Sequence, residues 1–153
     1  GAVAIDISDD ALKVADYNKK YNNADYIKLI KSDMFSSSEC EQYKNEDNRF
    51  DVIVSNPPYI PTKDIDELSE EVRLHDPVLA LDGDTDGLKF YKAITKQSVN
   101  YLKENGYLCY EIGYNQAEDV RNIMEQCGYS GIKVIKDLAG LDRVVIGRLN
   151  NIN

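Results

Sequence analysis

The sequence has no tryptophan, one histidine and three cysteines among its 153 residues. Cys40, Cys109 and Cys127 lack the close spacing of a metal site, and His75 has no possible ligand partner nearby in the sequence. No apolar run approaches the roughly eighteen residues that a membrane helix needs, and the chain does not open with a signal peptide. We therefore expect a cytoplasmic protein with reduced thiols, no metal and no membrane association.

Basic residues are also scarce. Eighteen lysines and arginines face 27 aspartates and glutamates, giving a net charge of −9, and the basic residues are scattered among acidic ones. Proteins that grip duplex phosphates usually carry a basic face, so direct nucleic-acid binding is not expected, although a small basic patch on the folded surface stays open. With 42% hydrophobic residues, the chain suits a single domain spanning residues 1–153.

Strand and helix patterns alternate along the chain. Ser8 is placed to cap a helix that has acids in its first turn and Lys19 and Lys20 at its end. A second helix is expected over 88–104, and a third begins with a capping box of Asn115 and Glu118 and ends at Cys127-Gly128. We expect a surface loop over 36–49 and a long functional loop over 61–87. Strands are expected at 3–7, 26–33, 50–55, 107–113, 132–138 and 143–149.

This order predicts an α/β fold with a mostly parallel sheet and one late antiparallel strand. In such sheets, ligands bind beyond the carboxyl ends of the strands, where Asp6, Asp33 and Asn56 fall. Asp6 is suited to accept hydrogen bonds from ribose hydroxyls, or it simply faces solvent. Asp33 is suited to accept from an adenine amino group while Met34 covers the ring, or it is a turn aspartate.

The stretch "SNPPYIP" (55–61) carries the strongest signal. Two adjacent prolines end the preceding strand and make a rigid corner. A planar nitrogen that must attack a methyl group needs its N–H bonds held by fixed acceptors, and the Asn56 side-chain oxygen and the Pro57 carbonyl are two such acceptors. Tyr59 offers a flat face for a planar amide or base. We interpret Asn56, Pro57, Pro58 and Tyr59 as the substrate corner, with Asn56 and Pro57 carrying the chemistry.

"NPPY" after a central strand resembles the motif of S-adenosylmethionine-dependent methyltransferases that act on planar nitrogens. The segment 60–94, "EIG" (111–113) and "DLAGLDRVVIGR" (137–148) resemble the HemK/PrmC family, which methylates the N5 amide nitrogen of glutamine in peptide chain release factors. The resemblance implies a Rossmann-like class I methyltransferase fold and methyl transfer to the glutamine of a Gly-Gly-Gln loop. It further implies that Asp6, Asp33, Met34 and Asn56 contact S-adenosylmethionine, and that Asn56, Pro57, Pro58 and Tyr59 hold the glutamine amide.

The chain departs from the family in three places. Met34 stands where an aromatic residue is common, and Gly83-Asp84 stands where the family has two glycines. The first strand of the family's fold, its glycine-rich cofactor loop and its helical domain have no counterpart here. We therefore expect an N-terminally truncated catalytic domain with weak or no activity. The strands at 3–7 and 50–55 would close the gap by re-pairing or by self-association of two copies.

Four other functions compete with this one. An N6-adenine or N4-cytosine DNA methyltransferase would use the same corner, but the acidic charge argues against it. Methylation of a ribosomal-protein glutamine is a sibling activity. A non-catalytic binding partner would not need a free, aimed proline carbonyl. A nicotinamide-dependent dehydrogenase would leave the proline corner without a role.

Overall fold

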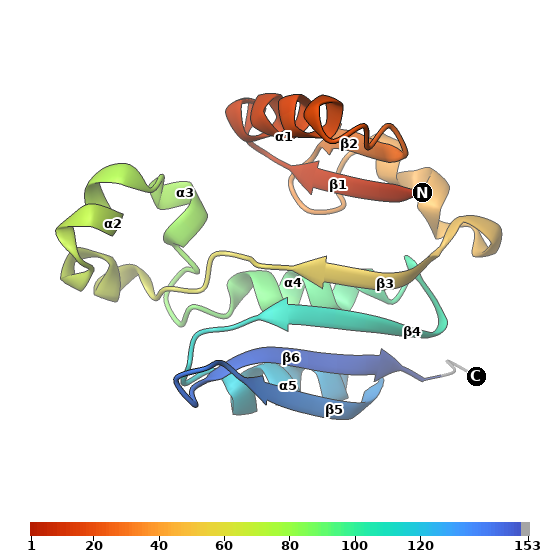
Figure 1. Cartoon of the computed structure of the whole chain (residues 1–153). Coiled ribbons are helices and arrows are strands. Elements are labelled where there is room, and N and C mark those ends of the chain that lie inside the picture. The colour runs from red at the N-terminus through yellow and green to blue at the C-terminus, as the bar shows by residue number, and fades with distance from the viewer. Residues whose placement is uncertain (151–153) are drawn as a thin grey trace. The chain divides into compact units, whose positions relative to one another are not determined.

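The computed structural model describes residues 1–150, the side chain of Leu74 excepted, and these divide into two compact units (Figure 1). The first unit, Gly1–Asn48, contains a two-stranded parallel sheet in which Ala2 pairs with Ile27 and Asp6 pairs with Lys31. Its elements are β1 (Ala2–Asp6), α1 (Asp9–Tyr21), β2 (Ile27–Lys31) and the 3₁₀ helices η1 (Ser38–Lys44) and η2 (Glu46–Asn48).

Helix α1 begins and ends as the sequence predicts. The Ser8 hydroxyl accepts a hydrogen bond from the Ala11 N–H at 3.2 Å, which satisfies one of the free donors in the first turn. Acidic side chains occupy that turn, and Lys19 and Lys20 occupy the last, where each sign of charge is favoured by the helix dipole. None of the α1 residues is buried within the described part of the chain.

The second unit is built on a four-stranded sheet with the order β3-β4-β6-β5. Strand β3 (Phe50–Ser55) runs parallel to β4 (Leu102–Glu111), and β6 (Asp142–Leu149) runs antiparallel to both β4 and β5 (Tyr129–Lys136). The predicted late antiparallel strand is therefore confirmed as β6. Within each unit, β1 pairs with β2 and β3 pairs with β4; the expected re-pairing or self-association of the strands at 3–7 and 50–55 stays a prediction.

Helices α4 (Lys89–Ser98) and α5 (Ala117–Gln126) lie behind the four-stranded sheet in Figure 1. Two hydroxyl pairs join α4 to the sheet: Thr95 with Tyr110 at 2.9 Å, and Ser98 with Tyr129 at 2.6 Å. The centre of this core consists of side chains that are almost fully buried: Tyr91, Leu102, Leu108, Tyr110, Ile112, Val120, Met124 and Val145.

The predicted helix over 88–104 is wrong in its second half, because α4 ends at Ser98 and β4 already begins at Leu102. Leu102 pairs with Phe50 and is completely buried, and this burial outweighs the local preference for helix. The expected strand at 107–113 therefore starts five positions earlier and ends at Glu111. Asn105-Gly106 falls in an irregular part of the β3–β4 ladder instead of ending a helix.

Three other local predictions need correction. The α5 helix is preceded by Gln116 and not by Asn115, and no side chain caps it, so the predicted capping box is absent in the described structure. The expected loop over 36–49 contains η1 and η2, and Cys40 is buried there. The long segment after the corner carries η3 (Thr62–Glu67), α2 (Glu70–His75) and α3 (Val78–Leu81). Within the described residues, no helix is long and apolar enough to span a membrane.

Candidate functional site

The proline corner begins where β3 ends. Ser55 pairs with Tyr110 of the parallel strand β4, so Asn56 leaves the sheet at the edge that also holds the carboxyl end of β4. Asn56 is exposed, whereas Pro57 is buried and Tyr59 is half-buried. Among residues 1–150, neither the Asn56 side chain nor the Pro57 carbonyl has a hydrogen-bond partner. Neither acceptor is therefore occupied by another group of the described residues.

The chain leaving the corner is held by backbone hydrogen bonds to the end of α3. The Ile60 N–H donates to the Leu81 carbonyl at 3.0 Å, and the Gly83 N–H donates to the Ile60 carbonyl at 2.8 Å. Thr62 adds a side-chain bond to the Asp82 carboxylate at 2.7 Å. The corner is thus anchored on one side by β3 and on the other by this short ladder.

Gln116 supplies a third anchor directly behind Tyr59. Its side chain is only 6% exposed, and its amide nitrogen donates to the Tyr59 carbonyl at 2.9 Å and lies 3.4 Å from the Gly87 carbonyl. Its amide oxygen accepts from the Gly113 N–H at 3.0 Å. The Tyr91 hydroxyl lies 3.4 Å from the same oxygen. One buried amide therefore joins the corner, the loop before α4 and the loop after β4.

Two glycines leave room for this arrangement. Gly87 has φ +71°, and a Cβ there would collide with the Tyr59 carbonyl and come within 2.8 Å of the Gln116 amide nitrogen. A Cβ at Gly113 would lie 2.8 Å from the Gln116 amide oxygen and 3.4 Å from the Tyr59 ring. Real Cβ atoms do not tolerate such approaches to fixed groups, so these positions suit glycine.

Tyr91 supports the site from within the core. Its hydroxyl donates to the Glu111 carbonyl at 3.0 Å, and its ring meets Tyr110 edge-on with 5.1 Å between centroids. Burial raises the pKa of the Tyr91 hydroxyl far above its usual value, so it stays neutral. It acts here as a hydrogen-bond donor and not as a base.

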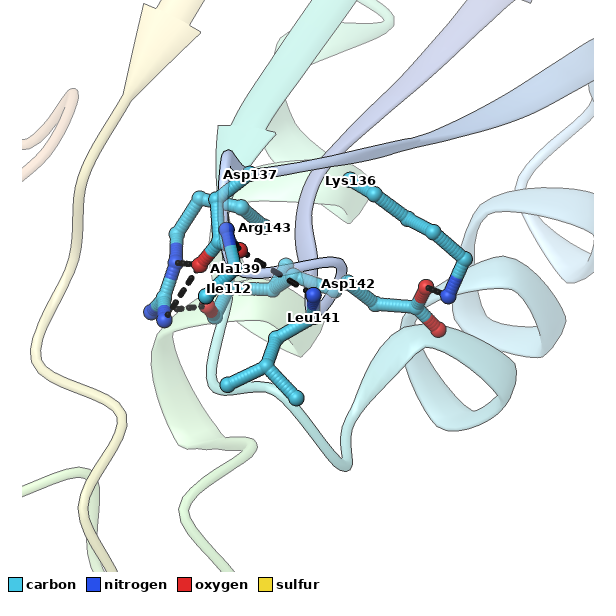
Figure 2. Close-up of polar contacts among 7 residues, drawn as sticks. All are labelled: Ile112, Lys136, Asp137, Ala139, Leu141, Asp142 and Arg143. Atoms are coloured by element: carbon cyan, nitrogen blue, oxygen red, sulfur yellow. Dashed lines mark hydrogen bonds and ion pairs between the residues drawn. The ribbon is translucent and has the colours of Figure 1, made fainter.

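The loop after β4 is fixed from the other side by the turn between β5 and β6 (Figure 2). Arg143 donates from Nη1 to the Ile112 carbonyl at 3.2 Å, and it donates from Nε and Nη2 to the Asp137 carboxylate at 3.3 and 3.2 Å. The Ile112 N–H in turn donates to the Arg143 carbonyl at 2.9 Å. Gly113, which contacts the Gln116 amide, therefore follows a residue tied to a charged turn.

The residues predicted to contact S-adenosylmethionine divide between the two units. Asp6 ends β1 and is exposed; one carboxylate oxygen accepts from the Ser8 N–H at 2.8 Å, and the other has no partner among the described residues. Asp33 is exposed and its carbonyl accepts from the Ser36 N–H at 3.0 Å, while Met34 is half-buried with φ +50°. Asn56, the fourth predicted contact, lies in the second unit.

In the structure, other residues hold the corner formed by Asn56, Pro57, Pro58 and Tyr59, and the sequence did not point to them. Gln116, Gly87 and Gly113 were not predicted as site residues. The sequence signal nearest to Gln116, the spacing of Asn115 and Glu118, predicts a helix cap at Asn115, whereas Gln116 is the residue that precedes α5. Nothing in the local pattern distinguishes the Gln116 amide from an exposed glutamine.

The chain matches the family model described as "Eco57I restriction-modification methylase" over residues 4–123. It is 41% identical over 144 residues to a release factor glutamine methyltransferase of Fusobacterium nucleatum, a match that covers 94% of this chain and 39% of that protein. It is 40% identical over 142 residues to a release factor glutamine methyltransferase of Clostridium acetobutylicum, covering 92% of this chain and 48% of that protein. The chain therefore spans less than half the length of these relatives.

The fold resembles a methyltransferase from Pyrococcus furiosus whose crystal structure is known. The TM-score is 0.68 at 18% sequence identity, and the match covers 97% of this chain and 62% of that one. The predicted Rossmann-like class I methyltransferase fold is confirmed by this likeness, which at such low identity concerns the fold alone.

Proposed function

The chain belongs to the Eco57I restriction-modification methylase family, whose model matches residues 4–123, and on this premise we propose that it forms the catalytic part of an S-adenosylmethionine-dependent protein-glutamine N5-methyltransferase. The acceptor would be the side-chain amide of the glutamine in the Gly-Gly-Gln loop of a peptide chain release factor. The names of the relatives at about 40% identity support this substrate. The observation that carries the proposal is the pair of acceptors at Asn56 and Pro57, which have no hydrogen-bond partner among residues 1–150.

The corner would orient the glutamine amide by accepting both of its N–H bonds. The Asn56 side-chain oxygen and the Pro57 carbonyl each take one, which turns the nitrogen lone pair toward the methyl donor. Tyr59 would pack against the planar amide. No strong general base is required, because a sulfonium methyl group is already activated toward displacement. Correct positioning is the main contribution of such a site, since misplacing reacting atoms by an ångström can cost about a hundredfold in rate.

The donor set in the first unit fits the cofactor. The free carboxylate oxygen of Asp6 can accept from a ribose hydroxyl, as acids at strand ends do in dinucleotide-binding folds. Asp33 would accept from the adenine amino group, and the half-buried Met34 thioether would pack on the ring in place of an aromatic side chain. When bound, S-adenosylmethionine supplies the electrophilic methyl group. We infer that both units serve one methyltransferase domain in the cytoplasm.

The test uses the full gene product that contains residues 1–153, incubated with S-adenosylmethionine and a release factor. Mass spectrometry should find one added methyl on the Gly-Gly-Gln peptide. Asn56→Ala should slow methylation by about a hundredfold, whereas Asn122→Ala, an exposed position on α5, should not. Wild-type activity in Asn56→Ala would remove the corner from the mechanism.

A second candidate function is methylation of an adenine or cytosine amino group in DNA, because the matching family model describes a restriction-modification methylase. An exocyclic amino group would present the same two N–H bonds to Asn56 and Pro57. The net charge of −9 disfavours it, since grip on phosphates needs basic residues. Duplex and single-stranded DNA therefore belong in the same assay, and label on DNA with none on the release factor would favour this function.

A further inference from the structure

We propose that Gln116 is a positioning residue that sets the direction of the Asn56–Tyr59 corner, an inference that rests on the proposed methyl transfer. The Gln116 amide holds the backbone carbonyl at the last residue of the corner, although 57 positions separate the two residues. It does not face the acceptors at Asn56 and Pro57 as a ligand would; it acts through the peptide that follows them.

The first argument is that the site uses both polar atoms of the amide. The nitrogen faces two carbonyls, those of Tyr59 and Gly87, and only a donor is favourable there. The oxygen faces the N–H of Gly113, which needs an acceptor. The glutamine amide offers a donor and an acceptor from one planar group, and it does so whatever the pH. A glutamate would direct a carboxylate oxygen at two carbonyl oxygens.

The second argument is burial. Gln116 is 6% exposed, and a buried amide that loses its partners carries a desolvation cost, so the bonds are held tightly. Gly87 and Gly113 surround the amide so closely that no Cβ fits at either position without displacing it or the Tyr59 carbonyl. The amide and the carbonyl it holds are therefore closely approached by backbone on these sides.

The third argument is geometric. The corner is fixed at its start by β3 and after its end by the ladder between Ile60 and Leu81. The peptide after Tyr59 is held at both of its polar groups: its N–H, from Ile60, donates to the Leu81 carbonyl at 3.0 Å, and its carbonyl accepts from the Gln116 amide at 2.9 Å. Without the Gln116 bond this peptide would be held at its N–H alone. Gln116 thus supplies the second of the two restraints on the peptide that ends the corner.

The experiment compares Gln116→Glu with Gln126→Glu in the full gene product. Both lie in or next to α5 and make the same chemical change, but Gln126 is exposed. Gln116→Glu should lower kcat for release-factor methylation by about ten- to a hundredfold while the dissociation constant for S-adenosylmethionine stays at its wild-type value. Its kcat should rise as pH falls, because a protonated glutamate can again donate to the Tyr59 carbonyl. Gln126→Glu should behave as wild type.

A purely structural role would give a different pattern. Activity lost only in proportion to the unfolded fraction, measured by thermal unfolding in the same buffer, or a kcat equal to wild type in folded Gln116→Glu, would overturn the proposal. Gln116→Asn is the second variant if the glutamate does not fold; its amide is one methylene too short to reach Tyr59 and Gly113 together, so a wild-type kcat there would also overturn it.

Hydrogen exchange separates this inference from the proposed function. If the wild-type protein methylates no release factor, the proposed function fails, yet exchange at the Ile60 N–H still reports on the corner. Faster exchange at Ile60 in Gln116→Glu than in Gln126→Glu would show that Gln116 holds the corner whatever the acceptor is. Unchanged exchange would overturn the positioning role by itself.

Discussion

Asp137 receives two hydrogen bonds from the Arg143 guanidinium, at 3.3 Å from Nε and 3.2 Å from Nη2, across the turn between β5 and β6. The other Asp137 carboxylate oxygen accepts from the Ala139 and Leu141 N–H groups at 2.9 and 3.0 Å (Figure 2). The same guanidinium reaches the Ile112 carbonyl. The Asp137 carboxylate therefore closes the turn between β5 and β6. It also holds Arg143, which ties that turn to Ile112 directly after β4.

Removing the charge from Asp137 should change how stability depends on pH. The Leu141 N–H, followed by the Arg143 side chain and the Ala139 N–H, lowers the pKa of the Asp137 carboxyl below its ordinary value. A lowered folded-state pKa gives stability that is present above about pH 4 and is lost as pH falls through the folded pKa. Urea unfolding of Asp137→Asn should therefore show a weaker acid dependence than wild type. The exposed Asn122→Ala variant, which removes no ionisable group, should keep the wild-type slope.

Gly87→Ala should destabilise the second unit more than Gly140→Ala does. Both glycines have positive φ, at +71° and +80°, so each alanine should cost about 1–2 kcal/mol of backbone strain. Nothing lies within 4 Å of a Cβ at Gly140, whereas a Cβ at Gly87 meets the Tyr59 carbonyl and the Gln116 amide. Overpacking should add about 1–3 kcal/mol at Gly87 alone. If urea unfolding gave equal losses of unfolding free energy for Gly87→Ala and Gly140→Ala, the crowding argued for Gly87 would be contradicted.

Asp84 stands where the resemblance to the HemK/PrmC family implies a second glycine, and its backbone conformation is one that suits glycine. Its φ is +73°, a conformation that glycine adopts freely and that aspartate tolerates better than most residues. Asp84→Gly and Asp84→Ala both delete the carboxylate that pairs with Lys89 at 3.0 Å. The glycine variant should nevertheless be more stable than the alanine variant by about 1 kcal/mol, measured by chemical unfolding. If the alanine variant were the more stable of the two, the difference would not come from the backbone conformation at position 84.

Alkaline pH should unfold the second unit through its buried tyrosines. Burial raises the pKa of Tyr129 to about 12 against the opposing hydrogen bond with Ser98, and burial raises the pKa of Tyr91 and Tyr110 further. A raised pKa means that this stability is complete below about pH 10 and is lost as pH rises toward the folded value. The part of the tyrosinate absorbance that belongs to these three residues should therefore develop late and together with loss of circular dichroism.

The matched variant for that experiment is Tyr129→Phe. At neutral pH it should lose about 1 kcal/mol, because it deletes the 2.6 Å bond to the Ser98 hydroxyl. Between pH 10 and 12 it should lose less stability than wild type. Complete titration of all tyrosines near pH 10 without unfolding would show that these hydroxyls are accessible to solvent.

Elements defined by local chemistry were predictable from the sequence. The Ser8 cap, with acids and lysines at opposite ends of α1, was confirmed, and β3 has the expected limits Phe50–Ser55. Two consecutive prolines allow few conformations, which is why the corner was placed correctly. The prediction was wrong over 99–106, where helix preference and a mostly polar sequence conceal the start of β4, in which Leu102 pairs with Phe50.

The support of the candidate site could not be predicted in this way. Gln116 acts on Tyr59 only because β4, β3 and the loop before α4 converge at one edge of the sheet. A contact over 57 positions leaves no trace in local composition or periodicity. The roles of Asp6, Asp33, Met34 and Asn56 toward the cofactor stay predictions, because they rest on their positions at strand ends and on resemblance.

The two buried hydroxyl pairs along α4 have a mechanical consequence. Apolar side chains alone would let a helix slide or roll on a sheet at little cost, but Thr95–Tyr110 and Ser98–Tyr129 are directional and lie one turn apart. Together they fix the position of α4 relative to both β4 and β5. Because α4 begins two residues after Gly87, which touches Tyr59, a shift of the outer strand β5 would be transmitted along the helix to the proline corner.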